Sequence, residues 1–146
     1  MKKIYFLLIV TVTILGGCSQ QKSSKIEGAW QLVNWRHLVG DSLVWEFPGK
    51  TTGSNLVIYS EHLFLSVGRF KNDTAYIDNS VGATYILKGN RSEETLLYFP
   101  IKDMVGKKVK SLLEVRNDTL IKTYPLDANW KVDKSGYSVE KYIRFK

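Results

Sequence analysis

Residues 28–35 read GAWQLVNW and residues 140–145 read EKYIRF. The first stretch places Gly28 two positions before Trp30, at the start of an apolar and aromatic segment, and the second places Arg144 near the end of the last such segment. If the two segments are neighbouring strands, the guanidinium of Arg144 can lie on the indole of Trp30, a cation–π contact that contributes about 0.5–2 kcal/mol. If they are not, Trp30 is only a core aromatic and Arg144 a surface cation. The pairing decides the fold, because it joins the two ends of the domain.

Between these segments, short apolar and aromatic runs without a helical period alternate with turn residues. Gly89-Asn90 and Asn117-Asp118 are typical of hairpin turns, and Pro48-Gly49 with residues 51–55 predicts a break. The pattern predicts strands at 29–36, 56–59, 62–70, 82–88, 93–99, 109–116, 119–124 and 137–145, with a shorter extended piece at 43–47. The fold class is therefore all-β.

Consecutive strands joined by short turns favour an up-and-down arrangement over parallel crossover units. An open sheet of this kind would expose unpaired backbone groups at its first and last strands, and pairing those two strands removes the exposed edges. We therefore predict an antiparallel up-and-down β-barrel of about eight strands. In such a barrel the start of the first strand lies beside the end of the last, where Trp30 and Arg144 stand.

The combination of glycine, any residue and tryptophan in the first strand with an arginine near the end of the last resembles the lipocalin signature. In that signature the tryptophan and the arginine pack across the closed end of the barrel. The layout is more closely similar to the small lipocalin-like lipoproteins of Gram-negative bacteria, many of which have no assigned function. The segments that carry the likeness are GAWQLVNW, IYSEHLFLSVGRF at 58–70, GATYILKGN at 82–90 and EKYIRF.

The resemblance implies a lipocalin-like β-barrel domain over residues 26–146. The chain also departs from the pattern. It is shorter than a typical secreted lipocalin, it has no Thr-Asp-Tyr motif between its later strands, and no segment predicts a helix packed on the barrel.

The single cysteine, Cys18, follows a basic start at residues 1–3, an uncharged apolar run at 4–15 and the small residues Gly16 and Gly17. These are the three regions of a signal peptide. Leu15-Gly16-Gly17-Cys18 also resembles the bacterial lipobox, which implies cleavage before Cys18 and acylation of its thiol. The alternative is a plain secretory signal with a coincidental cysteine. The apolar run is too short for a transmembrane helix, which needs about 20 residues.

We therefore predict a lipoprotein signal peptide over residues 1–17 and a lipidated Cys18 with a flexible polar tether over residues 18–25. The predicted partner of the acylated Cys18 is membrane lipid. The predicted location is the cell envelope of a Gram-negative bacterium, with the lipid in the outer membrane.

The charge of the chain argues against nucleic acid. Removal of residues 1–17 takes Lys2 and Lys3 from the 21 basic residues and leaves the 14 acidic ones, so the net charge falls from +7 to +5. The densest basic cluster, Lys107, Lys108 and Lys110, fits a solvated loop or a contact with anionic headgroups. We expect no nucleic-acid partner.

In a barrel, the inward side chains define any ligand site. Taking Trp30 as inward places Leu32 and Asn34 on the same face, and Phe64 shares a face with His62. The groups able to orient a ligand include Tyr59, Glu61 and Glu94, and the ligand-binding candidates that we select are His62, Phe64, Tyr85 and Tyr98. Each also has a structural explanation, because a tyrosine can pack its ring with its hydroxyl at the rim and His62 can be half-exposed beside its turn.

The sequence offers few groups for catalysis. Its two histidines, His37 and His62, lie in no metal-binding spacing, and there is no nucleophile elbow, phosphate loop or dinucleotide fingerprint. Glu93 and Glu94 are adjacent in a predicted strand, so their carboxylates point to opposite faces. We predict no catalytic residue, no metal site, no cofactor and no enzymatic activity.

Two functions remain open. The first is a lipid-anchored envelope protein that binds a small apolar or amphipathic molecule inside a β-barrel. The second is a non-enzymatic interaction module with a filled barrel, whose loops at 41–55, 100–110 and 125–135 contact another envelope protein. An apolar cavity of several hundred Å³, with His62 or a tyrosine in its wall, would favour the first function.

Overall fold

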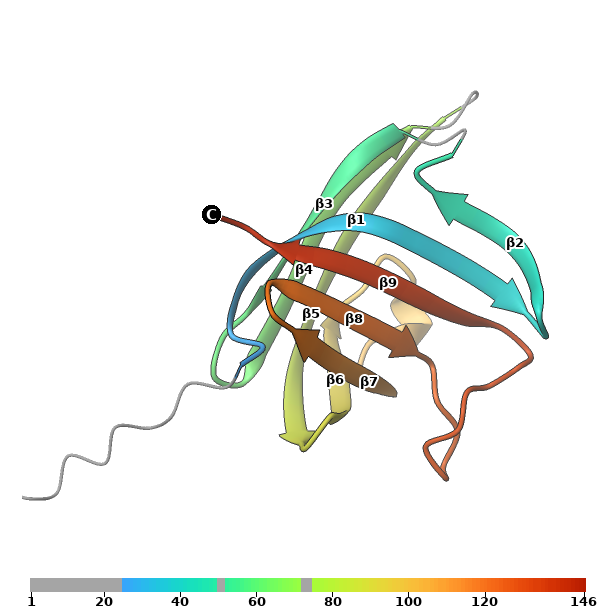
Figure 1. The fold of residues 1–146 in the computed structure, drawn as a ribbon. Helices are drawn as coiled ribbons and strands as arrows, with labels where there is room; N and C mark the ends of the chain where they lie inside the picture. Colours follow the sequence, from blue (N-terminus) through green and yellow to red (C-terminus); the bar gives the residue numbers. More distant parts are fainter. Residues whose placement is uncertain (1–24, 50–51, 72–74) are drawn as a thin grey trace, which may run out of the picture.

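The computed structural model describes residues 25–49, 52–71 and 75–146, so the predicted signal peptide and Cys18 lie outside the described residues. The described chain is almost entirely β-structure with one short 3-10 turn (Figure 1). Its elements are β1 (Gly28–Val39), β2 (Ser42–Phe47), β3 (Thr52–Tyr59), β4 (Leu63–Lys71), β5 (Tyr76–Lys88), β6 (Arg91–Tyr98), η1 (Lys102–Met104), β7 (Lys108–Arg116), β8 (Thr119–Tyr124) and β9 (Tyr137–Arg144).

The strands form one antiparallel sheet that closes on itself. The strand order is β2-β1-β3-β4-β5-β6-β7-β8-β9, and β1 also pairs with β9, from Trp30 opposite Arg144 to Leu38 opposite Tyr137. Eight strands therefore make a closed barrel, as predicted. The ninth strand, β2, lies outside this closed barrel. One edge of β1 pairs with β3 through residues 28–31 and with β2 through residues 35–39.

The two ends of the barrel differ in their connections. At the end that contains Trp30, the turns β3–β4, β5–β6 and β7–β8 are short, and Gly89 and Asn117 take the left-handed backbone conformation that such turns require. We call this the closed end. At the opposite end lie the longer β6–β7 connection, which carries η1, and the β8–β9 connection at residues 125–136. We call this the loop end.

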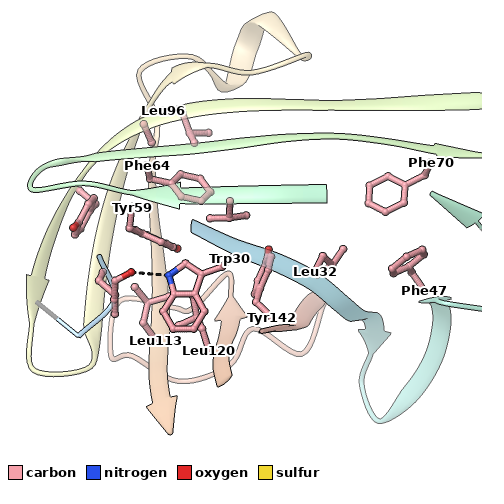
Figure 2. Close-up of a cluster of buried hydrophobic side chains, with 14 residues drawn as sticks. Trp30, Leu32, Phe47, Tyr59, Phe64, Phe70, Leu96, Leu113, Leu120 and Tyr142 are labelled. Atoms are coloured by element: carbon pink, nitrogen blue, oxygen red, sulfur yellow. Dashed lines mark hydrogen bonds between the residues drawn. The ribbon is translucent and has the colours of Figure 1, made fainter. Parts of the chain in front are cut away.

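The contact between Trp30 and Arg144 closes the first of these ends. Trp30 is fully buried, and its Nε1 donates to the carbonyl of Ile26 at 2.7 Å (Figure 2). The Arg144 guanidinium lies 4.1 Å from the centroid of the Trp30 ring. Arg144 also donates from Nη1 to the carbonyl of Glu27 at 2.9 Å. A Cβ on Gly28 would stand 2.7 Å from Nη1, and φ is +122° there, so only glycine fits beneath the arginine. The contact expected from GAWQLVNW and EKYIRF is thus present.

Two β-bulges decide which side chains point inward. The first lies between Leu32 and Asn34 in β1, where Val33 is the extra residue. Beyond it Trp35, rather than Asn34, takes up the inward series begun by Trp30 and Leu32, and the Asn34 amide donates instead to the carbonyl of Phe47 at 2.9 Å. The expectation that Asn34 shares the face of Trp30 is therefore wrong, because it assumed an uninterrupted strand.

The second bulge lies where β6 pairs with β5. Gly82 is opposite Tyr98 and Ala83 is opposite Leu96, so Leu97 is the extra residue. Leu96 is buried in the core, whereas Tyr98 is 70% exposed on the outside of the barrel. A Cβ on Gly82 would lie 2.9 Å from the Tyr98 ring, so the ring covers the position where Gly82 has no side chain.

Strands β3 and β5 begin earlier than the sequence pattern predicts. The predicted break at 51–55 is largely strand, and β5 starts at Tyr76 rather than Gly82, because Thr52, Lys71 and Tyr76 lie opposite one another across three strands. These segments extend β3, β4 and β5 past the rest of the barrel (Figure 1). Backbone pairing forms them without a strongly apolar sequence.

Candidate functional site

The barrel encloses a cavity of about 330 Å³ between its centre and the loop end. Phe99, Met104 and Pro125 reach it from the loop-end connections, and the other wall residues come from the strands. The lining is mostly apolar and consists of Trp35, Phe64, Ser66, Asn79, Val81, Glu94, Leu96, Phe99, Met104, Val109, Lys122, Tyr124, Pro125, Glu140 and Tyr142.

A buried ion pair stands in one wall of the cavity. Lys122 Nζ lies 2.9 Å from each carboxylate oxygen of Glu94, and the Ser111 hydroxyl donates to Glu94 Oε1 at 3.0 Å. The two charged side chains are only 5% and 3% exposed. Lys122 Nζ also lies 4.1 Å from the centroid of the Phe64 ring. Burial of such a pair is tolerated because each charge has a partner and further hydrogen bonds.

A second carboxylate, Glu140, lies opposite Lys122 across β8 and β9, and no cation of the described residues forms a direct ion pair with it. The hydroxyls of Tyr124 and Tyr142 donate to its two oxygens at 2.6 and 2.5 Å. Burial raises the pKa of Glu140, while Lys122 and the two tyrosine hydroxyls oppose that rise. Burial, with the Glu140 charge second, also raises the pKa of Tyr124 and Tyr142, so both hydroxyls stay protonated donors.

The opposite wall carries neutral polar groups. Asn55 donates from Nδ2 to the Ser66 hydroxyl at 3.0 Å, and Asn79 donates to Asn55 Oδ1 at 3.1 Å and to Ser66 at 3.0 Å. Ser66 and Asn79 line the cavity. The cavity therefore has apolar walls with a charged cluster on one side and an amide cluster on the other, an arrangement typical of sites for small amphipathic molecules.

The structure brings one of the four ligand-binding candidates to this cavity. Phe64 faces inward from β4 and lines the wall. Tyr85 is buried nearer the closed end, where its hydroxyl donates to the carbonyl of Ser60 at 2.7 Å, and it does not line the cavity. His62 lies in the β3–β4 turn, its side chain 76% exposed beside Glu61. Tyr98 lies outside because of the Leu97 bulge.

Several cavity residues were not singled out from the sequence, above all Lys122 and Glu140. A signal for both exists. Counting back by two from Arg144, which faces Trp30, gives Tyr142, Glu140 and Ser138, and counting forward from the buried Leu120 gives Lys122. The expectation for Glu93 and Glu94 is confirmed: Glu94 is buried inside, and Glu93 pairs with Lys108 at 2.7 Å on the outside.

Comparison with family models, with curated proteins and with solved structures finds no match for this chain. Within residues 25–49, 52–71 and 75–146, histidine, cysteine and carboxylate side chains form no group of three that could hold a metal ion. The same part of the chain has no helix with the length and apolarity needed to cross a bilayer.

Proposed function

We propose that this protein is a lipid-anchored protein of the Gram-negative cell envelope that binds a small apolar or amphipathic molecule in its barrel. The observation that carries the proposal is the cavity of about 330 Å³, at the lower end of the range of small-molecule sites, about 300–1,000 Å³. Its mostly apolar wall supplies burial for the ligand body, and its few polar groups supply orientation.

The cavity also favours this function over a filled interaction module. A filled barrel would bring inward side chains into contact across the centre, as Trp30, Leu113 and Leu120 do near the closed end (Figure 2). Farther along the barrel, Phe64 and Tyr142 instead border the cavity. Tyr124 and Tyr142 give the cavity the tyrosine-bearing wall that favours the binding function.

The proposed lipid anchor would attach the barrel to the membrane by its closed end. Arg144 Nη2 donates to the carbonyl of Lys25 at 3.0 Å, so the described chain begins at the closed end. A tether over residues 18–25 would span at most about 3.3–3.6 Å per residue, which holds the closed end near the membrane and leaves the loop end free. Replacement of Cys18 by serine should release the protein from the membrane fraction, and retention there would contradict the anchor.

Cavity binding can be tested with a neutral environment-sensitive dye, Nile red, and the unlipidated full chain carrying Cys18→Ser. Val81 lines the cavity from β5, and Ile86 on the same strand is exposed on the outer face. We expect saturable dye fluorescence that Val81→Phe reduces at least about tenfold in affinity and Ile86→Phe leaves unchanged. Equal binding by both variants, or no saturable binding, would overturn the proposal.

A further inference from the structure

The charges inside the cavity are unbalanced. Its lining contains two carboxylates, Glu94 and Glu140, and one ammonium, Lys122, with no other lysine, arginine or histidine among the described lining residues. Fully ionised, the cluster carries one net negative charge inside the barrel. Buried charge without a partner is unfavourable, so a cation that entered the cavity would compensate it.

The charge of Lys122 is already compensated by Glu94, so it is a poor partner for an anionic ligand. Both oxygens of Glu94 lie 2.9 Å from its Nζ, and the rings of Phe64 and Tyr124 lie 4.1 and 5.0 Å from it. A ligand carboxylate or phosphate at this wall would be a third negative group and would have to break the Glu94 pair to gain a cation. The cluster therefore disfavours fatty-acid-like ligands.

Glu140 does have capacity for a donor. It is 6% exposed and lines the cavity, and its oxygens accept one hydrogen bond each from Tyr124 and Tyr142. A carboxylate offers about four acceptor positions, so about two remain. Charge-assisted hydrogen bonds of a carboxylate to an ammonium are also stronger than those between neutral groups.

We propose that the cavity selects cationic amphiphiles, whose apolar body packs against Phe64, Leu96 and Val109 and whose protonated amine binds Glu140. The inference rests on the proposed ligand-binding function and deepens it by naming the class of ligand. The described wall supplies each part: apolar side chains for the body and a buried carboxylate without an ion-pair partner for the head.

Isothermal titration calorimetry with three probes of equal chain length tests the inference. The unlipidated full chain is titrated with octylammonium, octanoate and octanol below their micellar concentrations. We expect octylammonium to bind at least about tenfold more tightly than either of the others, a difference of about 1.4 kcal/mol. Equal or tighter binding of octanoate or octanol would overturn the cationic preference and leave the proposed binding function standing. No binding of any probe would overturn both.

Two variants then locate the preference. Glu140→Gln should remove the advantage of octylammonium while leaving octanol binding within about twofold. Glu93→Gln makes the same change of charge on the outer face and should leave all three affinities unchanged. An unchanged preference in Glu140→Gln would refute the role of that carboxylate. If this variant does not fold, the comparison of the three probes on the unsubstituted barrel still decides the ligand class.

Discussion

Lys122→Met should be one of the most damaging single substitutions in the barrel. At 2.9 Å the attraction between Lys122 and Glu94 is about 6 kcal/mol for an effective dielectric constant near 20, and it offsets the desolvation of both groups. Methionine keeps the packing of the lysine stem but leaves the Glu94 carboxylate buried without a cation. Removing one member of a buried pair costs about 3–5 kcal/mol, so we expect a loss of that size in the free energy of unfolding.

Urea unfolding followed by tryptophan fluorescence and by circular dichroism measures the effect. The control is Glu94→Gln combined with Lys122→Met, which removes both charges and keeps an acceptor for the Ser111 hydroxyl. The double variant should recover at least about half of the loss, because position 94 no longer carries an uncompensated charge. A single variant within about 1 kcal/mol of the parent, or a double variant as unstable as the single one, would refute the view that Lys122 compensates Glu94.

Four further substitutions have distinct expected outcomes. Arg144→Met should lower the free energy of unfolding by about 2 kcal/mol, since it removes the contact with the Trp30 ring and two hydrogen bonds to backbone carbonyls. A negligible loss of stability in urea unfolding would contradict the role of Arg144 in closing the barrel. Tyr59→Phe should be neutral or stabilising, because the buried Tyr59 hydroxyl has no hydrogen-bond partner within the described residues. Tyr85→Phe should cost about 1 kcal/mol, because it removes the hydrogen bond to the Ser60 carbonyl. The reverse order of the two unfolding midpoints would show this hydrogen-bond assignment to be wrong. Burial raises the pKa of Glu140 above its unfolded value, so ionisation of this carboxyl opposes folding. Glu140→Gln should therefore be the more stable protein at pH 8, and its advantage should shrink as the pH falls through that raised pKa toward about 4.3, the value of an unperturbed glutamate. A stability difference independent of pH would contradict the assignment.

The sequence pattern was sufficient for most of the fold. Turn residues such as Gly89 and Asn117 mark the tight connections of the closed end, and the alternating apolar runs between them predict strands. Trp30 and Arg144 predict which strands close the barrel, because an aromatic and a guanidinium stabilise each other only when adjacent. The extensions of β3 and β5 were missed, since their backbone pairing needs no apolar side chains.

The candidate site was predicted only in part. Phe64 is the ligand-binding candidate that lines the cavity, although alternation alone does not say which face of its strand points inward. The same alternation correctly separates Glu94 from Glu93. Tyr98 could not be placed, because a bulge moves every later side chain of its strand to the other face. Alternation from Leu120 places Lys122 on the inner face, but a lysine is rarely buried without a partner, and its partner Glu94 lies on another strand.

The sequence by itself determined the all-β character, the approximate strand positions and the closing contact, because these depend on local turn chemistry, on side-chain alternation and on one pair of residues. Only the tertiary structure decided which faces point inward beyond Val33 and Leu97, and that Glu94, Lys122 and Glu140 meet around one cavity. The physical reason is that a strand presents two equivalent faces until its neighbours pair with it. The register of that pairing, bulges included, then determines which charges are buried together.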